Sequence, residues 1–186
     1  MNAWKVALAG VGLGVLGVIL GRVKLNRRTV LRQAVAPADV EAAVRAHARE
    51  ILGGENETVE RALLAWVDLE SAFDANTITQ AATGTAYGLF QLLDRFFLPS
   101  AIEQNLLPPG SAGEQLLLPV VNITLGVENA IMLLQHADNP GGDFRARFLA
   151  ARSRALGCGF RCNCAPETCA RVTRRGLAAL DKWGVA

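Results

Sequence analysis

Among the residues that could do chemistry, Glu70 stands out because its neighbours on a predicted helix are apolar. Val67 and Phe73 lie three residues to either side, and Trp66 and Leu63 lie four and seven residues earlier, so all share one helix face. A carboxylate on such a face is costly unless it is neutral or paired. A carboxyl group that stays protonated near neutral pH can serve as a general acid. The alternative is a buried glutamate satisfied by backbone donors or by an arginine.

Three sequence blocks follow one another in a recognisable order. The first is Glu70-Ser71-x-Phe73, the second is the run from Gly84 to Leu92 (GTAYGLFQL), and the third is Asn122-Ile123-x-x-Gly126. Together they resemble the soluble lytic transglycosylase family, whose marks are Glu-Ser-x-aromatic, Gly-Ala-x-Gly-Leu-x-Gln and Asn-Ile-x-x-Gly. Each block alone is weak, but the three in order are a strong signal, and the resemblance spans residues 40–160.

The resemblance implies a lysozyme-like helical fold with a cleft for alternating N-acetylmuramic acid and N-acetylglucosamine. Glu70 would protonate the glycosidic oxygen and then act as base on the muramic 6-hydroxyl, giving a 1,6-anhydro product without a cofactor. A single prominent carboxylate suits this reaction, since glycoside hydrolysis generally needs two. Asp68 projects away from Glu70 along the helix, whereas Asp74, one turn on, is the candidate second carboxylate for a lysozyme-type hydrolase.

The same match assigns the substrate-binding residues. Ser71 would support Glu70 or the substrate, and Gln91 would offer hydrogen bonds to an acetamido group, with a polar helix cap as its alternative role. The remaining residues placed in the cleft by the match are Gly88, Leu89, Tyr87, which falls at a variable position of the family pattern, and Asn122 of the third block.

One block departs from the family pattern. The family carries Ala-Ala-Tyr-Asn-Ala-Gly, with the tyrosine directed at the catalytic glutamate, whereas this chain has Arg152 and Ser153 at the Tyr and Asn positions. Arg152 is expected to contact Glu70 or the substrate. Because a neighbouring cation favours the ionised carboxylate, this contact works against the acid role of Glu70.

The N-terminal segment Ala3–Gly21 is apolar apart from Lys5. It approaches the about 20 residues that a membrane-spanning helix needs, and Trp4 and Arg22 suit the two interfaces. We expect a transmembrane anchor over residues 1–23, in which glycines spaced by four allow close approach of another helix. A signal peptide is the alternative, but no good small-residue cleavage site follows the apolar run.

The predicted domain plan continues with a basic linker over residues 24–38, a transglycosylase-like domain over 39–157, and a cysteine-rich turn with a C-terminal helix over 158–186. Periodicity and Pro or Gly punctuation predict helices over 37–53, 56–73, 86–97, 116–137, 144–156 and 166–183, with a short turn of helix at 99–104. Residues 74–86 are expected to form a loop, and no stretch predicts a strand. The expected fold class is therefore all-α, a lysozyme-like domain behind one transmembrane helix.

Four cysteines close to the C-terminus lie outside the family resemblance: Cys158, Cys162, Cys164 and Cys169. Two disulfides fastening the turn to the last helix are favoured if the domain works in the periplasm. A four-thiolate zinc site is the main alternative, although the spacing lacks the usual pair of C-x2-C knuckles, and free thiols are a further one. His47 and His136 have no evident partners and are expected to be structural.

The expected function is that of an enzyme cutting peptidoglycan glycan strands, held at the inner membrane facing the periplasm or in a virion membrane or particle. The net charge is only +2, with 19% charged residues, which does not favour nucleic acid as a partner. Basic residues after the anchor would place the body in the cytoplasm, so an unusual route, such as a phage particle or a secretion complex with helix–helix partners, is expected. The second hypothesis is a structural protein of such an assembly that keeps the fold without activity.

Overall fold

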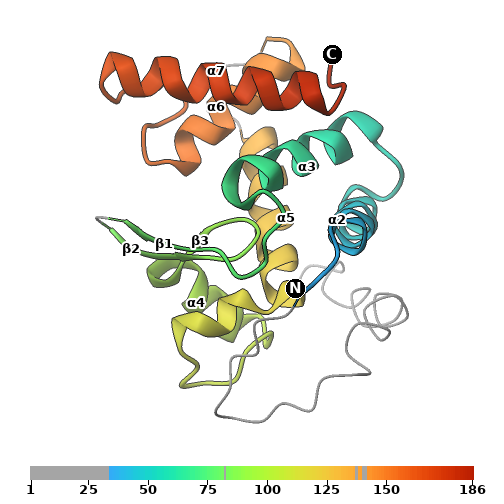
Figure 1. Ribbon diagram of the computed structural model, residues 1–186, viewed down its shortest axis with the longest axis vertical. Coiled ribbons are helices and arrows are strands. Elements are labelled where there is room, and N and C mark those ends of the chain that lie inside the picture. Colours follow the sequence, from blue (N-terminus) through green and yellow to red (C-terminus); the bar gives the residue numbers. More distant parts are fainter. Residues whose placement is uncertain (1–33, 82, 137, 140–141) are drawn as a thin grey trace.

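The computed structural model describes residues 34–81, 83–136, 138–139 and 142–186 as a mostly helical molecule with one small sheet (Figure 1). Its elements in chain order are α2 (Pro37–Leu52), α3 (Glu57–Ser71), β1 (Ile78–Ala81), β2 (Gly84–Tyr87), β3 (Leu92–Leu93), α4 (Asp94–Glu103), the 3₁₀ helix η3 (Gly113–Leu117), α5 (Pro119–Gln135), α6 (Phe144–Ala155) and α7 (Pro166–Lys182).

Local sequence signals account for the ends of most helices. Proline stands in the first turn of α2, α5 and α7, where its missing N–H costs nothing. Asn56 and Asp143 cap α3 and α6 by accepting backbone N–H groups at 3.2 and 2.8 Å. These helices lie where the sequence predicts them.

The expectation of an all-α domain without strands is wrong in the region after α3. There β1, β2 and β3 form an antiparallel sheet, in which Ile78 pairs with Tyr87 and Ala86 with Leu93. Strand β1 shows no apolar alternation because Ile78 itself is exposed on the surface. The predicted helix over 86–97 is interrupted by left-handed backbone at Gly88 and Gln91, so the helical segment starts only at Asp94.

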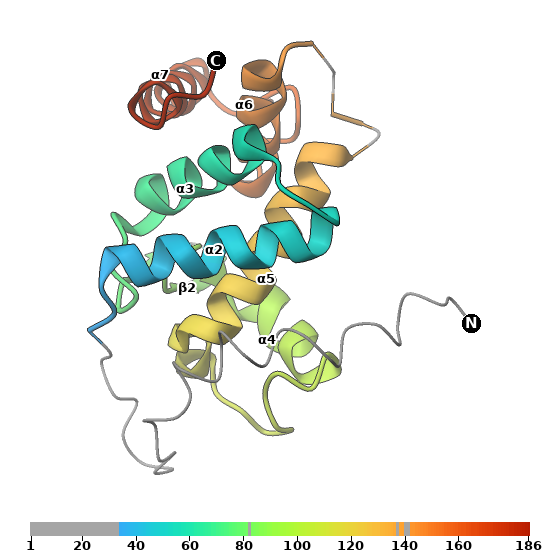
Figure 2. The same cartoon turned by 90° about the vertical axis from the view of Figure 1, so that its right-hand side faces the viewer.

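Helix α5 forms the centre of the described fold, with α2 on one side, α6 beyond its end and η3 at its start (Figure 2). Its buried side chains include Val121, Leu125, Val127 and Ile131. At Gly126 the helix passes so close to Phe90 that an added Cβ would meet the ring at 2.2 Å. This contact brings the segment after β2 directly against α5.

The predicted anchor over residues 1–23 lies outside the described residues, as does most of the predicted basic linker. Among the residues that the structure describes, no helix is both long and apolar enough to cross a membrane. The anchor therefore stays a prediction from the sequence.

Candidate functional site

Glu70 lies in the last turn of α3, and its side chain is 16% exposed. The end of α3 lies between the sheet on one side and the α6–α7 pair on the other (Figure 1). Two non-glycine residues in the left-handed region follow, Ala72 with φ 50° and Phe73 with φ 65°. Such backbone costs on the order of 1 kcal/mol or more per residue and persists only where its surroundings hold it.

Helix α7 supplies that support. The ring of Phe73 lies against Trp183, with 5.6 Å between their centroids. Asp68, one turn before the strained residues, accepts from Lys182 Nζ at 2.7 Å and from Trp183 Nε1 at 3.4 Å. The last turn of α3, which carries Glu70, and the residues after it are thus fixed by Lys182 and Trp183.

Arg152 of α6 makes the expected contact with Glu70. Its Nη1 lies 2.9 Å from Oε1 of Glu70, and its side chain is only 8% exposed. The guanidinium also lies over the ring of Trp66, 5.5 Å from the centroid. Burial lowers the pKa of Arg152; the charge of Glu70 opposes this shift, and the charge of Arg175 adds to it.

The ion pair leaves the guanidinium incompletely satisfied. Within the described residues, Nε of Arg152 has no hydrogen-bond partner and Nη1 has only its contact with Glu70, and both atoms are buried. A buried charged donor without an acceptor is costly, and such groups in native structures call for an explanation. The site therefore has unused donor capacity beside Glu70.

The third sequence block holds the second one in place. Asn122 is fully buried, and its Nδ2 donates to the carbonyls of Tyr87 and Leu116 at 2.8 Å each. Its Oδ1 accepts the N–H of Phe90 at 2.8 Å. A Cβ at Gly88 would meet the Asn122 amide at 2.5 Å, so glycine is required there by space as well as by its φ of 73°.

The other predicted substrate-binding residues divide between interior and surface. Leu89 and Tyr87 are buried in the core, and Ser71 is buried with its hydroxyl donating to the Val67 carbonyl at 3.1 Å. Gln91 is half-buried and caps no helix, since its Nε2 donates to the carbonyls of Thr77 and Gly88 at 3.1 and 2.9 Å.

In this arrangement Glu70 and Gln91 are predicted site residues with part of a side chain exposed, and Arg152 lies buried beside Glu70. The other predicted residues shape the backbone after β2 instead; they are Tyr87, Gly88, Leu89 and Asn122. Asp74, the candidate second carboxylate, is exposed and accepts the backbone N–H of Asn76 at 2.9 Å, which stabilises the turn.

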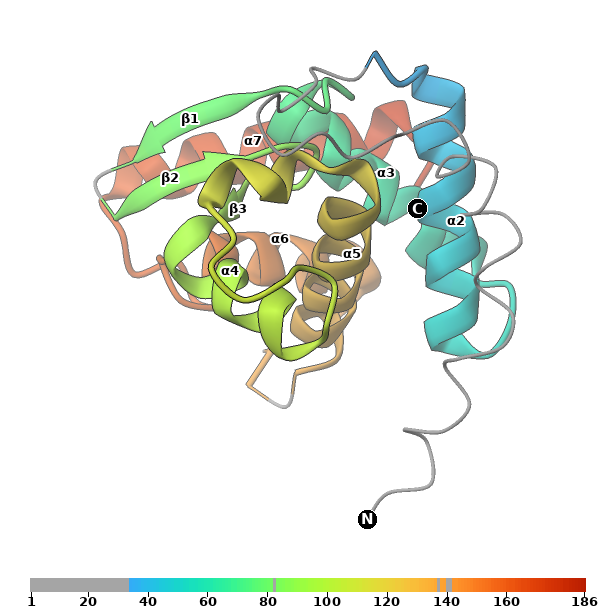
Figure 3. The same ribbon diagram turned by 90° about the horizontal axis from the view of Figure 1, so that it is seen from below.

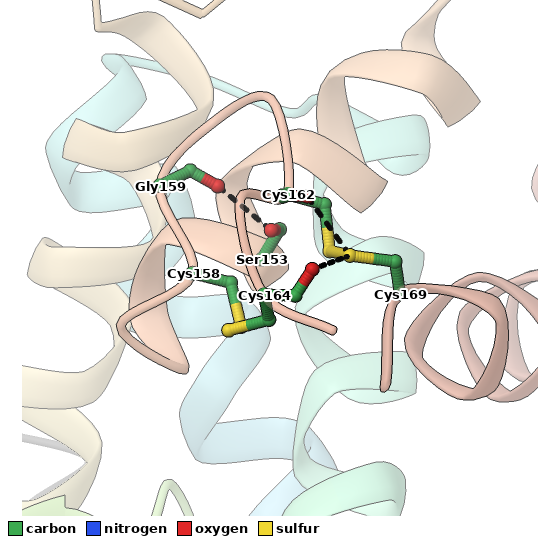
Figure 4. The surroundings of a disulfide bond; sticks show 6 residues. All are labelled: Ser153, Cys158, Gly159, Cys162, Cys164 and Cys169. Carbon is green, nitrogen blue, oxygen red and sulfur yellow. Dashed lines mark hydrogen bonds between the residues drawn. A yellow bond between two sulfur atoms is a disulfide. The ribbon is translucent and has the colours of Figure 1, made fainter. Parts of the chain in front are cut away.

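The four cysteines form two disulfides, Cys158–Cys164 and Cys162–Cys169, with Cα separations of 5.1 and 5.8 Å (Figure 4). This pairing leaves no thiolate for a zinc ion. The turn is fastened to α6 because Ser153 Oγ donates to the Gly159 carbonyl at 2.7 Å. Since Ser153 follows Arg152, the disulfide-bonded turn fixes the end of α6 that carries the site arginine.

Arg175 of α7 belongs to the site, although the sequence shows it only as one of many arginines in a basic stretch. Its Nη2 donates to the Leu69 carbonyl at 3.3 Å, next to Glu70. No pattern in the sequence singles it out, because the contact joins residues 106 positions apart.

Comparisons of this chain with protein-family models, with curated proteins and with solved structures found no match. The resemblance to the soluble lytic transglycosylase family therefore rests on the sequence motifs alone.

Proposed function

We propose that this protein is a lytic transglycosylase with a lysozyme-like fold, which cuts the bond between N-acetylmuramic acid and N-acetylglucosamine in peptidoglycan. The carboxyl group of Glu70 donates its proton to the glycosidic oxygen as the C1–O bond of the muramic residue breaks. The 6-hydroxyl oxygen then attacks C1, and the Glu70 carboxylate takes up the hydroxyl proton. The product is a 1,6-anhydro sugar, and no water is consumed.

The observation that carries this proposal is the contact of Glu70 with Arg152, which stands where the family has its tyrosine. Asn122 of the third block holds the backbone of the second, and Arg152, at the position of the family's tyrosine, contacts Glu70 at 2.9 Å. Glu70 and Arg152 lie far apart in the sequence and meet in space, as the resemblance implies for these two positions. The left-handed residues after Glu70 add support, because such strain gathers at functional sites.

The ion pair of Arg152 with Glu70 must open before Glu70 can act as an acid. In the resting site Oε1 of Glu70 is held by Arg152 at 2.9 Å, whereas an acid catalyst must present its carboxyl group to the glycosidic oxygen. Substrate binding must therefore draw Arg152 away from Glu70 before the proton can be carried. The same ion pair supports the second hypothesis, an inactive structural protein of a phage particle or membrane complex.

The third hypothesis, a lysozyme-type hydrolase, requires a second carboxylate. Asp74 is the nearest candidate along the chain, but its Oδ1 is bonded to the backbone of its own turn. The geometry therefore favours the transglycosylase over the hydrolase.

The test is digestion of purified peptidoglycan by the full-length chain, with the products identified by mass spectrometry. The proposal expects anhydromuropeptides from the wild type, and a loss of at least about a hundredfold for Glu70→Gln, the lower range for removal of a general acid. Asp74→Asn is the matched control, because it also removes one carboxylate but should leave the anhydro products unchanged.

Other outcomes select the other hypotheses. Reducing-end products that disappear in Asp74→Asn identify a hydrolase. A folded wild-type protein, verified by circular dichroism, that releases nothing from peptidoglycan identifies the structural protein.

A further inference from the structure

Charge is sharply divided along the described chain. Residues 144–186 hold nine Lys or Arg and two Asp or Glu, whereas residues 34–143 hold four and fifteen. The C-terminal unit of α6, the disulfide-bonded turn and α7 is therefore strongly cationic, although the net charge of the protein is only +2. A local excess of one sign attracts ligands of the other.

Several of these cations hold the fold together. Arg145 pairs with Asp181 at 2.6 Å, Arg147 donates to the Leu134 carbonyl at 2.6 Å, and Lys182 pairs with Asp68 at 2.7 Å. Arg171 and Arg174 of α7 differ, since both are exposed and neither has an ion pair with any residue of the described ranges.

The position of Arg171 follows from helix geometry. Arg171, Arg175 and Lys182 are spaced by four and seven residues, which puts them on one stripe of α7. Lys182 and Arg175 reach the last turn of α3, at Asp68 and Leu69. Arg171 is one turn earlier, about 6 Å along the axis, and therefore lies beyond the end of α3.

The figures show the course of the helix that carries Arg171. Figures 1 and 3 both show the N-terminal half of α7 extending past the end of α3 and over β1 and β2. Together with Arg152 and Arg175, Arg171 completes a row of three arginines leading outward from Glu70. We call these residues the arginine row.

A neutral sugar chain gives this row no counter-charge. A carboxylate does, since guanidinium groups bind carboxylates through paired charge-assisted hydrogen bonds. Arg152 holds an unused donor for such a bond at Nε, its Nη1 contacts only Glu70, and its side chain is more than nine-tenths buried. A carboxylate that engaged it would also compete with Glu70 for the same cation.

We propose that the arginine row binds carboxylate groups of the glycan substrate beside the bond to be cut, and that this contact releases Glu70 from Arg152. The inference rests on the proposed function and adds a subsite that binds the carboxylate groups of this substrate. Wall glycans offer such groups from two sources, the stem peptides and the lactyl groups that become free when stem peptides are removed.

The test is calorimetric titration of the full-length Glu70→Gln chain with soluble glycan strands. One preparation keeps its stem peptides, a second has lost them to an amidase, and in a third all carboxylates are converted to methylamides. The proposal expects about tenfold or more weaker binding of the methylamide strands, in line with loss of more than one charged contact. The first two preparations identify the source of the carboxylate.

Arg171→Gln tests the row itself. It should weaken binding of carboxylate strands by about three- to fivefold, as expected for one partly exposed charge pair, and should leave methylamide strands unaffected. Arg171→Lys should restore most of the affinity. Arg95→Gln is the matched control, because it removes one exposed arginine of α4, on the opposite side of the sheet, and should change nothing.

Equal binding of charged and methylamide strands overturns this inference, and so does an equal loss for Arg95→Gln. Binding of phosphatidylglycerol vesicles through Arg171 in place of strands also overturns it, since the face would then contact a membrane. If strands bind in a carboxylate-dependent way but the wild-type chain releases no anhydro product, only the catalytic proposal is refuted. Anhydro products released equally fast from charged and neutral strands refute only the inference.

Discussion

Two glutamates of the same helix are paired with arginines, yet they differ in how completely they are satisfied. Glu60, at the start of α3, is 1% exposed and binds Arg49 through both oxygens at 2.9 and 3.0 Å. Its carboxylate also accepts from Arg45 at 3.2 Å and from the Asn56 N–H at 3.2 Å. Glu70, at the other end, has one arginine, and that arginine keeps an unused donor.

The difference separates a structural ion pair from a candidate functional one. The pKa of Glu60 is lowered chiefly by its hydrogen bond with Arg49, so its charge is fixed. A complete set of partners ties α2 to α3 and leaves nothing for a ligand. Glu70 and Arg152 do not use all their hydrogen-bonding groups. Arg152 can therefore exchange the carboxylate of Glu70 for that of a ligand.

The strongest test of this contrast is Glu60→Gln. Loss of the buried charge breaks the bidentate pair with Arg49, and we expect the free energy of unfolding to fall by about 2 kcal/mol. Cleavage per folded molecule should not change, in contrast to the loss expected for Glu70→Gln. Urea denaturation and the digestion assay measure the two quantities.

Glu41→Gln is the control for this change. Glu41 also pairs with Arg45 at 2.9 Å but is 39% exposed, so its removal should cost less than about 0.5 kcal/mol. An equal cost for both substitutions would show that burial does not distinguish the Glu60 pair.

Acid should abolish the contribution of Glu60. A carboxyl group whose pKa is lower in the folded than in the unfolded chain stabilises the fold above its unfolded value, here 4.5. That stabilisation is lost as the pH falls through the lower folded pKa. The stability difference between wild type and Glu60→Gln should therefore be constant near neutral pH and shrink below pH 4.5, as measured by urea denaturation across a pH series; a gap that persists in strong acid would contradict it.

A small effect is expected for Arg152→Met. Methionine keeps contact with Trp66 and removes a buried cation whose Nε lacks a hydrogen-bond partner, while Glu70, 16% exposed, keeps access to water. Stability should therefore stay within about 1 kcal/mol of wild type. If Arg152→Met lowers the free energy of unfolding as much as Glu60→Gln does, the ion pair of Glu70 with Arg152 is a structural one. Thermal unfolding of both variants side by side makes the comparison.

The helices were predictable because their signals are local. Proline in the first turn, side-chain caps and apolar periodicity each act within a few residues, and they mark α2, α3, α5, α6 and α7 closely. The sheet was not predictable, because β1 is stabilised by pairing with β2 and shows no alternation of apolar and polar residues. Its one large apolar residue, Ile78, is exposed. Helix α4 was misplaced because it continues through Pro99, which the sequence treats as a break.

The candidate site divides in the same way. Glu70 could be found from its apolar helix face, and its contact with Arg152 from the position that the family gives to tyrosine. The structural role of Asn122 could not be predicted. Residue type alone does not distinguish an amide that binds a ligand from one that donates to backbone carbonyls distant in the sequence. Arg175 and the pairing of the cysteines likewise depend on packing that only the folded chain brings about.

The division of charge between residues 34–143 and 144–186 gives the described part of the molecule an electric dipole, with its positive pole on the side of α6 and α7. Near a polyanionic surface such a body experiences a torque before it experiences contact, so it arrives with the arginine row already turned toward the polymer. Orientation then precedes binding, and the productive fraction of encounters should fall as salt shortens the range of the field. For the proposed glycan-cleaving activity, that fraction would set how often Glu70 meets a bond.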